Sequence, residues 1–163
     1  MNNETFKKIG DWNKVKLLCS IIGEEMQKAE QLCLQRFSLK AEALAKTHLS
    51  LQDLKWTALK PATIARKVRN GHSENILIQT STYFQSITSW VEGETAYAGV
   101  KKTARSGGED LANIARVQEF GSKSRNIPAR PLWKPVWDEA MVWVVKHNSP
   151  VDIFMKRIEK YNK

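Results

Sequence analysis

The sequence predicts an α+β fold with a long N-terminal helix, a small antiparallel sheet built on a hairpin, and C-terminal helices. Apolar residues recur at helical spacing near the N-terminus, and β-branched and aromatic residues flank a glycine turn at the centre. Strong helix starts follow near the C-terminus. The 163 residues suffice for one core. We expect a long helix over 1–53, an α+β core over 54–147 and a last helix over 148–163.

The first helix is expected from Asp11 to about Leu49. Apolar residues recur every three or four positions on one face, namely Val15, Leu18, Ile22, Met26, Ala29, Cys33 and Phe37. A helix of about 38 residues would be about 57 Å long, more than a small domain needs to cover its core. Part of it is therefore expected to project or to pack on another copy. A break near Ser38 or Thr47 is the alternative to a continuous helix.

Turn-forming residues mark the boundaries of the helices and strands expected in the centre of the chain. Pro61 suits the first turn of a second helix, and residues 69–75 are rich in turn-forming residues. Thr80 and Ser81 are candidate caps for a short helical turn. Strands are expected over 86–91 and 95–100, joined by a glycine turn at 92–94.

The C-terminal elements are marked by caps. Residues 101–109 contain two glycines and three basic residues, which is typical of a mobile loop. Asp110 is placed to begin a helix that Gly121 ends. Another helix is expected over 136–147, and Ser149 with Pro150 marks the start of the last one.

The cysteines and the apolar runs exclude several classes of protein. Cys19 and Cys33 lie 14 residues apart, about 21 Å along a helix, so they cannot pair, and both are expected to be small buried apolar residues. Neither cysteine nor histidine spacing fits a metal site, so no metal and no cofactor are expected. No apolar run spans a bilayer and no signal peptide is present, so no membrane contact and a cytoplasm-like compartment are expected.

The net charge of +9 is concentrated in two segments. Residues 54–70 carry five basic and no acidic side chains, and residues 101–134 carry eight basic and three acidic ones. These segments are either solvated basic faces or contact surfaces for an acidic partner or nucleic-acid backbone. A basic nucleic-acid-binding module is therefore the alternative function.

The sequence predicts no enzyme. Ser86, His72 and Asp110 are the residues from which a catalytic triad could be imagined, but no nucleophile-elbow pattern surrounds the serine. No phosphate-binding glycine loop is present either. The six tryptophans suit core or interface anchoring better than base stacking, since three of them lie in apolar helical sequence.

The most informative segment is Gln118-Glu119-Phe120-Gly121 followed by Ile127-Pro128-Ala129-Arg130-Pro131-Leu132-Trp133. Its prolines fix their own φ and favour extended geometry at the residue before each of them. The segment is therefore a rigid connector. Arg130 suits either a bidentate carboxylate contact across an interface or an intramolecular contact that pins the connector to its own core.

Three separated segments together resemble the phage virion morphogenesis family, the tail completion or head–tail joining proteins of tailed phages of the Mu-like type. The first runs from Trp56 to Thr63, and the second, Leu77 to Ile87, includes Thr80, Ser81 and Ser86. The third is the connector with its Phe120-Gly121 and Ile-Pro-Ala-Arg-Pro blocks. The chain departs from the family pattern where Ser81 replaces a glycine, where Gln118-Glu119 replaces His-Gln, and in a longer basic insert over 101–109.

The resemblance implies a structural virion subunit that forms a ring, expected to be a hexamer, at the neck or upper end of the tail. Its partners would be other copies, neck proteins and tail-tube proteins, with non-specific DNA contact in the channel. It would occupy the host cytoplasm during assembly and the virion afterwards. The interface or structural motif residues would be Trp56, Thr80, Ser86, Phe120, Gly121, Pro128, Arg130, Pro131 and Trp133. The candidate basic contact loop contains Lys101, Lys102 and Arg105.

Overall fold

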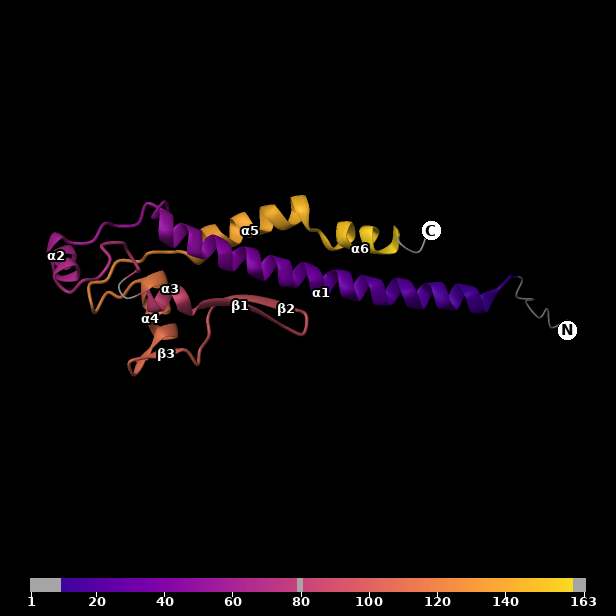
Figure 1. The fold of residues 1–163 in the computed structure, drawn as a ribbon, viewed down its shortest axis with the longest axis horizontal. Coiled ribbons are helices and arrows are strands. Elements are labelled where there is room, and N and C mark those ends of the chain that lie inside the picture. The colour runs from indigo at the N-terminus through magenta and orange to yellow at the C-terminus, as the bar shows by residue number, and fades with distance from the viewer. Residues whose placement is uncertain (1–9, 79–80, 160–163) are drawn as a thin grey trace, which may run out of the picture.

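A computed structural model describes residues 10–78 and 81–159 and confirms the predicted mixture of helices and a small antiparallel sheet. Helix α1 lies along the long axis of the molecule, with α5 and α6 along one side, the β1–β2 hairpin along the other, and α2 beyond its C-terminal end (Figure 1). The elements are α1 (Trp12–Leu51), α2 (Pro61–Arg69), α3 (Thr82–Ser86), β1 (Ile87–Glu92), β2 (Thr95–Val100), β3 (Arg105–Ser106), β4 (Glu109–Asp110), α4 (Leu111–Phe120), α5 (Trp133–His147) and α6 (Pro150–Ile158).

Helix α1 is continuous over 40 residues. Asp11 caps its start, with Oδ1 accepting a hydrogen bond from Lys14 N at 3.1 Å. The alternative of a break near Ser38 or Thr47 is not observed. Both hydroxyls donate to carbonyls in the preceding turn, at 2.9 Å each, so the helix accommodates them without interruption.

The β1–β2 hairpin closes as predicted, with Glu92 paired with Thr95 and Ile87 with Val100. Gly93 has φ of 57° in the two-residue turn, a conformation that glycine adopts without strain. The outer face carries a stacked pair, Trp90 and Tyr97, with ring centroids 5.1 Å apart.

The core lies between α1, α5 and β1. The buried apolar residues of this cluster are Phe37, Ala41, Leu44, Ala45, Leu49, Ile87, Leu132, Val136 and Ala140. A smaller cluster of Ala29, Cys33 and Ile153 joins α1 to α6. Where α6 ends, buried Glu25 accepts from Arg157 Nε at 2.7 Å. The core thus covers only the part of α1 that follows residue 24.

Three local predictions need correction. Residues 101–109, expected as a loop, contain β3 and the start of β4, which pair as a second hairpin with strands of two residues each. Cys19 is exposed rather than buried, since no core element lies beside the N-terminal part of α1. Helix α5 begins at Trp133, three residues before the predicted start. Among the described residues no helix is long and apolar enough to cross a membrane.

Candidate functional site

The three segments that carry the family resemblance meet around one cavity of about 740 Å³, which we call the basic cavity. Its lining comes from residues 57–67, 77–83 and 106–130. In the ribbon these segments gather around α2, α3 and α4, at the end of the molecule opposite the N-terminus (Figure 1). Segments more than 60 positions apart in the sequence therefore build a single site.

Arg130 lines this cavity and is 6% exposed. Its Nη2 donates to Thr57 O and its Nη1 to Gln118 Oε1, each at 3.4 Å, while Nε is buried and has no hydrogen-bond partner among the described residues. Burial lowers the pKa of the Arg130 guanidinium from its ordinary value. Of the two roles predicted for Arg130, the structure shows the intramolecular one, because the side chain joins the connector to residues 57 and 118.

The connector is held at its base by Gly121. This residue has φ of 74°, and a Cβ there would lie 2.8 Å from Ala129 N and 2.9 Å from Ile127 O. Beside it, Gln118 O accepts from Arg130 N at 2.7 Å. No side chain larger than hydrogen fits at position 121 unless the backbone of residues 127–129 moves. This close approach explains why the motif has a glycine at that position.

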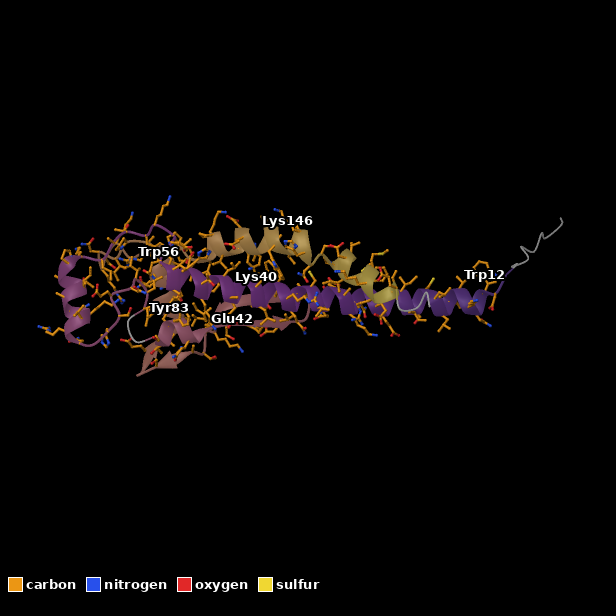
Figure 2. The ribbon with its side chains drawn as sticks, turned by 45° about the horizontal axis from the view of Figure 1, so that its top comes forward. Trp12, Lys40, Glu42, Trp56, Tyr83 and Lys146 are labelled. Carbon is orange, nitrogen blue, oxygen red and sulfur yellow. The ribbon has the colours of Figure 1, made fainter. Side chains whose placement is uncertain are left out.

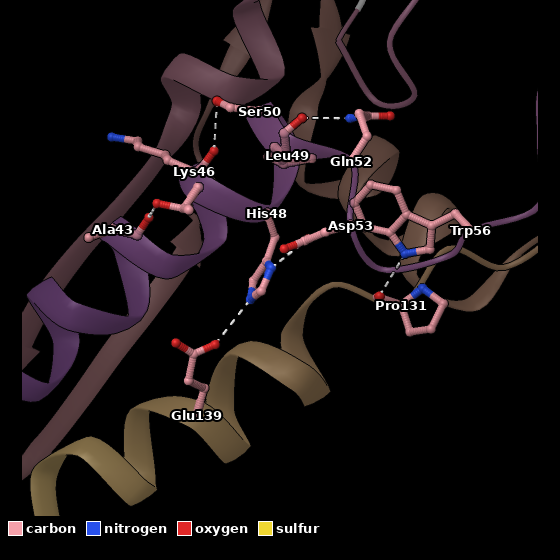
Figure 3. A network of polar contacts seen from close by, with 11 residues as sticks. Ala43, Lys46, His48, Leu49, Ser50, Gln52, Asp53, Trp56, Pro131 and Glu139 are labelled. Atoms are coloured by element: carbon pink, nitrogen blue, oxygen red, sulfur yellow. Dashed lines mark hydrogen bonds and ion pairs between the residues drawn. The ribbon is translucent and has the colours of Figure 1, made fainter.

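The first and third motif segments are joined directly. Trp56 Nε1 donates to Pro131 O at 2.9 Å, so the tryptophan ring lies against the second proline of the connector (Figure 3). Close to this bond, the His48 ring joins α1 to α5, with Nδ1 2.7 Å from Asp53 Oδ1 and Nε2 3.3 Å from Glu139 Oε2 (Figure 3). The connector therefore enters α5 from a position that α1 fixes.

Glu119 caps α5. Its carboxylate accepts from Leu132 N at 2.8 Å and from Trp133 N at 3.2 Å, where the free amides of the first turn favour negative charge. Burial, followed by the charge of Glu119, raises the pKa of Tyr83 to about 12, so its hydroxyl stays protonated at neutral pH. The residue that departs from the family's His-Gln pattern thus has a clear structural role.

Lys67 is the second buried cation of the cavity, at 7% exposure. Its Nζ donates to Asn75 O at 2.6 Å and to Ile78 O at 3.0 Å, which closes the loop after α2. Burial, together with the charge of Arg130, lowers the pKa of this lysine. Two cations therefore lie near each other with neutral groups as their hydrogen-bond acceptors.

Other predicted motif residues have different surroundings. Phe120 is 77% exposed, and Trp133 is half-buried at the start of α5. Ser86 donates its hydroxyl to Tyr83 O at 2.7 Å. Pro128 lines the cavity. Thr80 lies outside the described residues.

Ser81, which stands where the family has glycine, takes φ of 59° and precedes α3. The left-handed turn is thus kept without the glycine. A non-glycine residue in this region costs on the order of 1 kcal/mol, which surrounding contacts must offset.

The candidate contact loop lies at the surface. Lys101 Nζ lies 5.3 Å from the Trp90 ring centroid, and Arg105 Nη1 lies 3.3 Å from Asp110 Oδ1. The backbone carbonyl of Lys102 accepts from Arg105 Nη1 at 3.0 Å. Lys101 and Arg105 are thus engaged locally, and none of the three residues lines the basic cavity.

Sequence reasoning missed the burial of Lys67 and the cap formed by Glu119. Lys67 belongs to the basic run 54–70, and it lies three and four positions after half-buried Ile64 and Thr63 on the inward face of α2. That spacing was the available signal, although the apolar residue next to Lys67, Val68, is 51% exposed. Glu119 gave no signal, since its partners lie 13 and 14 residues away.

A second feature is the part of α1 before the core, which we call the projecting segment (residues 12–24). Trp12 lies at its far end, well away from Trp56 and Tyr83 (Figure 2). The apolar face here continues the face that α6 covers further along the helix. The exposed members of this face reach just past the segment and are between 41% and 50% exposed, and we call them the exposed stripe: Val15, Leu18, Ile22 and Met26.

Comparison of the chain with protein families, curated proteins and solved structures finds no match. Among the described residues, no group of three or more histidine, cysteine or acidic side chains could hold a metal ion. The basic cavity and the exposed stripe are therefore the two candidate functional features of the described residues.

Proposed function

We propose that the protein is a structural subunit of a tailed-phage or prophage virion, acting in tail completion or head–tail joining as part of a ring. The observation that carries the assembly role is the exposed stripe on the projecting segment of α1. The motif resemblance supplies the virion context, and the meeting of its three segments around one cavity supports that resemblance.

The stripe has the properties of an interface rather than of an ordinary surface. Leu18 and Ile22 are about half exposed, at 50% and 49%, although they continue the face that Ala29 and Cys33 bury against α6. Each apolar side chain of this size gains about 1.5–3 kcal/mol when it leaves water completely. Contiguous exposed apolar surface of this kind marks interaction sites.

A ring needs two different patches, one on each side of the subunit. Helix α5 offers the second patch, because Trp137, Met141 and Val145 lie at helical spacing and are 48%, 43% and 66% exposed. A head-to-tail contact between the stripe of one copy and the α5 patch of the next would repeat around a closed ring. We propose that this contact joins neighbouring subunits.

We also propose that the subunit has no catalytic turnover. The hydroxyl of Ser86 is bound to Tyr83 O, and Asp110 caps α4 by accepting from Asn113 N at 3.0 Å. Both groups therefore serve local structure. Assembly would take place in the host cytoplasm, and the assembled subunit would reside in the neck or tail.

The test compares two neighbouring leucines of the projecting segment. Leu18 belongs to the exposed stripe, whereas Leu17, 61% exposed, points to another face of the same helix. Wild type, Leu18→Asp and Leu17→Asp are purified and examined by sedimentation velocity and negative-stain imaging, alone and with a tail-tube protein of a tailed phage. Far-UV circular dichroism checks that each variant is folded.

We expect wild type to be monomeric or weakly associated alone and to form rings with the tail-tube protein. Leu18→Asp should remain a folded monomer under both conditions, and Leu17→Asp should assemble as wild type does. A wild-type protein that never enters tails would remove the virion proposal. Equal assembly by both variants would remove the stripe as the contact.

A basic nucleic-acid-binding module is the second candidate, and one observation favours it. The two basic segments meet at the cavity, where Lys60 and Arg66 come from the first and Arg125 from the second. This function predicts binding to generic duplex DNA with a logarithm of affinity that falls steeply with the logarithm of salt concentration. Absence of binding at low salt, measured by fluorescence anisotropy, would eliminate it.

A further inference from the structure

The basic cavity contains a cation whose charge is not balanced by any of the described residues. Arg130 is 6% exposed, so more than nine-tenths of it is buried. Its Nε has no hydrogen-bond partner among the described residues. Its two terminal nitrogens make long contacts, at 3.4 Å, to a carbonyl and an amide oxygen. A buried guanidinium without a carboxylate or another anion is costly, because burial penalises the charged form.

A second buried cation adds to this charge. Lys67 donates to two carbonyl oxygens, and an ammonium group has a third hydrogen to donate. The pKa of Lys67 is lowered by burial and by Arg130, and the pKa of Arg130 is lowered by burial. Each change in pKa means that the surroundings oppose the positive charge which both side chains carry at neutral pH.

The rim of the cavity has the same sign. Lys60, Arg66 and Arg125 line it at exposed positions, and Glu109 is the one acidic residue among its described lining. The volume of about 740 Å³ falls in the range typical of small-molecule sites, about 300–1,000 Å³. The cavity therefore offers space, buried donors and an excess of positive charge in one place.

We propose that the basic cavity is an oxyanion-binding site, in which Arg130 and Lys67 hold a carboxylate or a phosphate group and the rim cations attract it. One oxygen of the anion would accept from Arg130 Nε and a second oxygen from the remaining hydrogen of the neighbouring terminal nitrogen, which is the bidentate geometry that arginine offers to both anions. The anion would supply the charge that the fold leaves unbalanced.

This inference differs from the proposed assembly through α1, because it concerns the opposite end of the molecule and a different kind of contact. The exposed stripe is apolar and begins at residue 15, whereas the cavity is charged and formed by residues 57–130. Loss of one property need not affect the other, so the two are tested separately.

The test measures thermal stability and binding in the wild-type chain at pH 7. Sodium phosphate and sodium acetate are each titrated against sodium chloride at matched ionic strength. Ligand binding to the folded state alone should raise Tm by about 4 °C at about ten times the dissociation constant. Isothermal titration calorimetry with each anion gives the affinity, and the stronger of the two identifies phosphate or carboxylate as the source.

Two neighbouring arginines of α2 provide a matched pair of variants. Arg66 lines the cavity, whereas Arg69 is exposed on the same helix and does not. Arg66→Gln should weaken anion binding about fivefold, and Arg69→Gln should leave it unchanged. Arg130→Lys keeps a positive charge but removes the planar guanidinium with its paired donors. It should therefore weaken binding at least about tenfold.

Anion-specific stabilisation that is reduced in Arg66→Gln and Arg130→Lys but kept in Arg69→Gln supports the site. If Arg130→Lys does not fold, the comparison of Arg66→Gln with Arg69→Gln decides. The proposal is overturned if neither anion raises Tm more than chloride does. It is also overturned if all the folded variants respond as wild type does, because the anion would then bind elsewhere.

Discussion

The two parts of α1 carry the same apolar spacing but have different surroundings. From Ala29 onward the apolar face is covered, and Ala29, Ala45 and Leu49 are completely buried against α5, α6 and the hairpin. In the projecting segment the same face leaves Leu18 and Ile22 about half exposed, at 50% and 49%. Helical periodicity therefore shows which face of α1 is apolar, but the packing of other elements decides which part stabilises the monomer and which part remains for assembly.

The largest expected effect separates a buried leucine from an exposed one. Leu49→Ala leaves a cavity at a fully buried position and should reduce the free energy of unfolding by about 4 kcal/mol. Leu18→Ala, in the projecting segment, should change it by less than about 0.5 kcal/mol in the monomer. Urea unfolding of both variants provides the measurement, and similar losses at the two positions would contradict the division of α1.

The next comparison makes the same glycine-to-alanine substitution at two positions, where it should change the free energy of unfolding in opposite directions. Gly121→Ala places a Cβ 2.8 Å from Ala129 N at positive φ and should cost about 3 kcal/mol. Gly23→Ala lies in the helix of the projecting segment with no atom within 4 Å, so it should stabilise by about 0.5–1 kcal/mol. Thermal unfolding measures both, and a neutral Gly121→Ala would show that the connector is not held as described.

The smallest effect concerns two glutamates of α1 and depends on pH. Burial opposes the charge of Glu42, but hydrogen bonds from Lys46 at 2.6 Å and Ser89 at 2.7 Å outweigh it, so the pKa of this carboxyl is lowered. Its folded pKa lies below its unfolded one, so its contribution is present at neutral pH and is lost as pH falls through the lowered pKa. Glu42→Gln should therefore cost about 1 kcal/mol at pH 7.

The matched control for this pH effect is Glu24→Gln. Glu24 is exposed, and its carboxylate lies 3.7 Å from Lys28 Nζ, so the substitution should leave stability unchanged within error. Unfolding free energies are compared between pH 7 and pH 3. The difference between wild type and Glu42→Gln should shrink as the pH falls, and a difference that is constant with pH would exclude the ion pair as its source.

The parts of the fold that sequence predicts are those specified by local chemistry. Asp11, Asp110 and Ser149 cap the helices that they were expected to begin, and the Gly93 turn closes the predicted hairpin. Each of these signals acts within a few residues and needs no knowledge of distant neighbours. The exposure of Cys19 was not predicted, because it depends on where α6 ends.

The candidate site was only partly predictable for the same reason. Proline and glycine spacing indicated a rigid connector, and Gly121 is indeed confined by Ala129 and Ile127. The unbalanced charge at Arg130 could not be inferred, since it depends on Thr57 and Lys67, which lie more than 60 positions away. Burial of a charged residue is set by tertiary packing, which sequence pattern does not specify.

The central claim is that the projecting segment is left uncovered in the isolated chain and is covered on assembly. Hydrogen–deuterium exchange with peptide resolution along α1 tests it most directly. In the isolated protein, amides of residues 25–51 should exchange slowly, and those of residues 12–24 should exchange at least about a hundredfold faster, because the core clusters of the described residues lie further along the helix. Assembly with the tail-tube protein should slow exchange over 12–24 alone. Equal protection along the whole helix before assembly, or no gain of protection after it, would contradict the account.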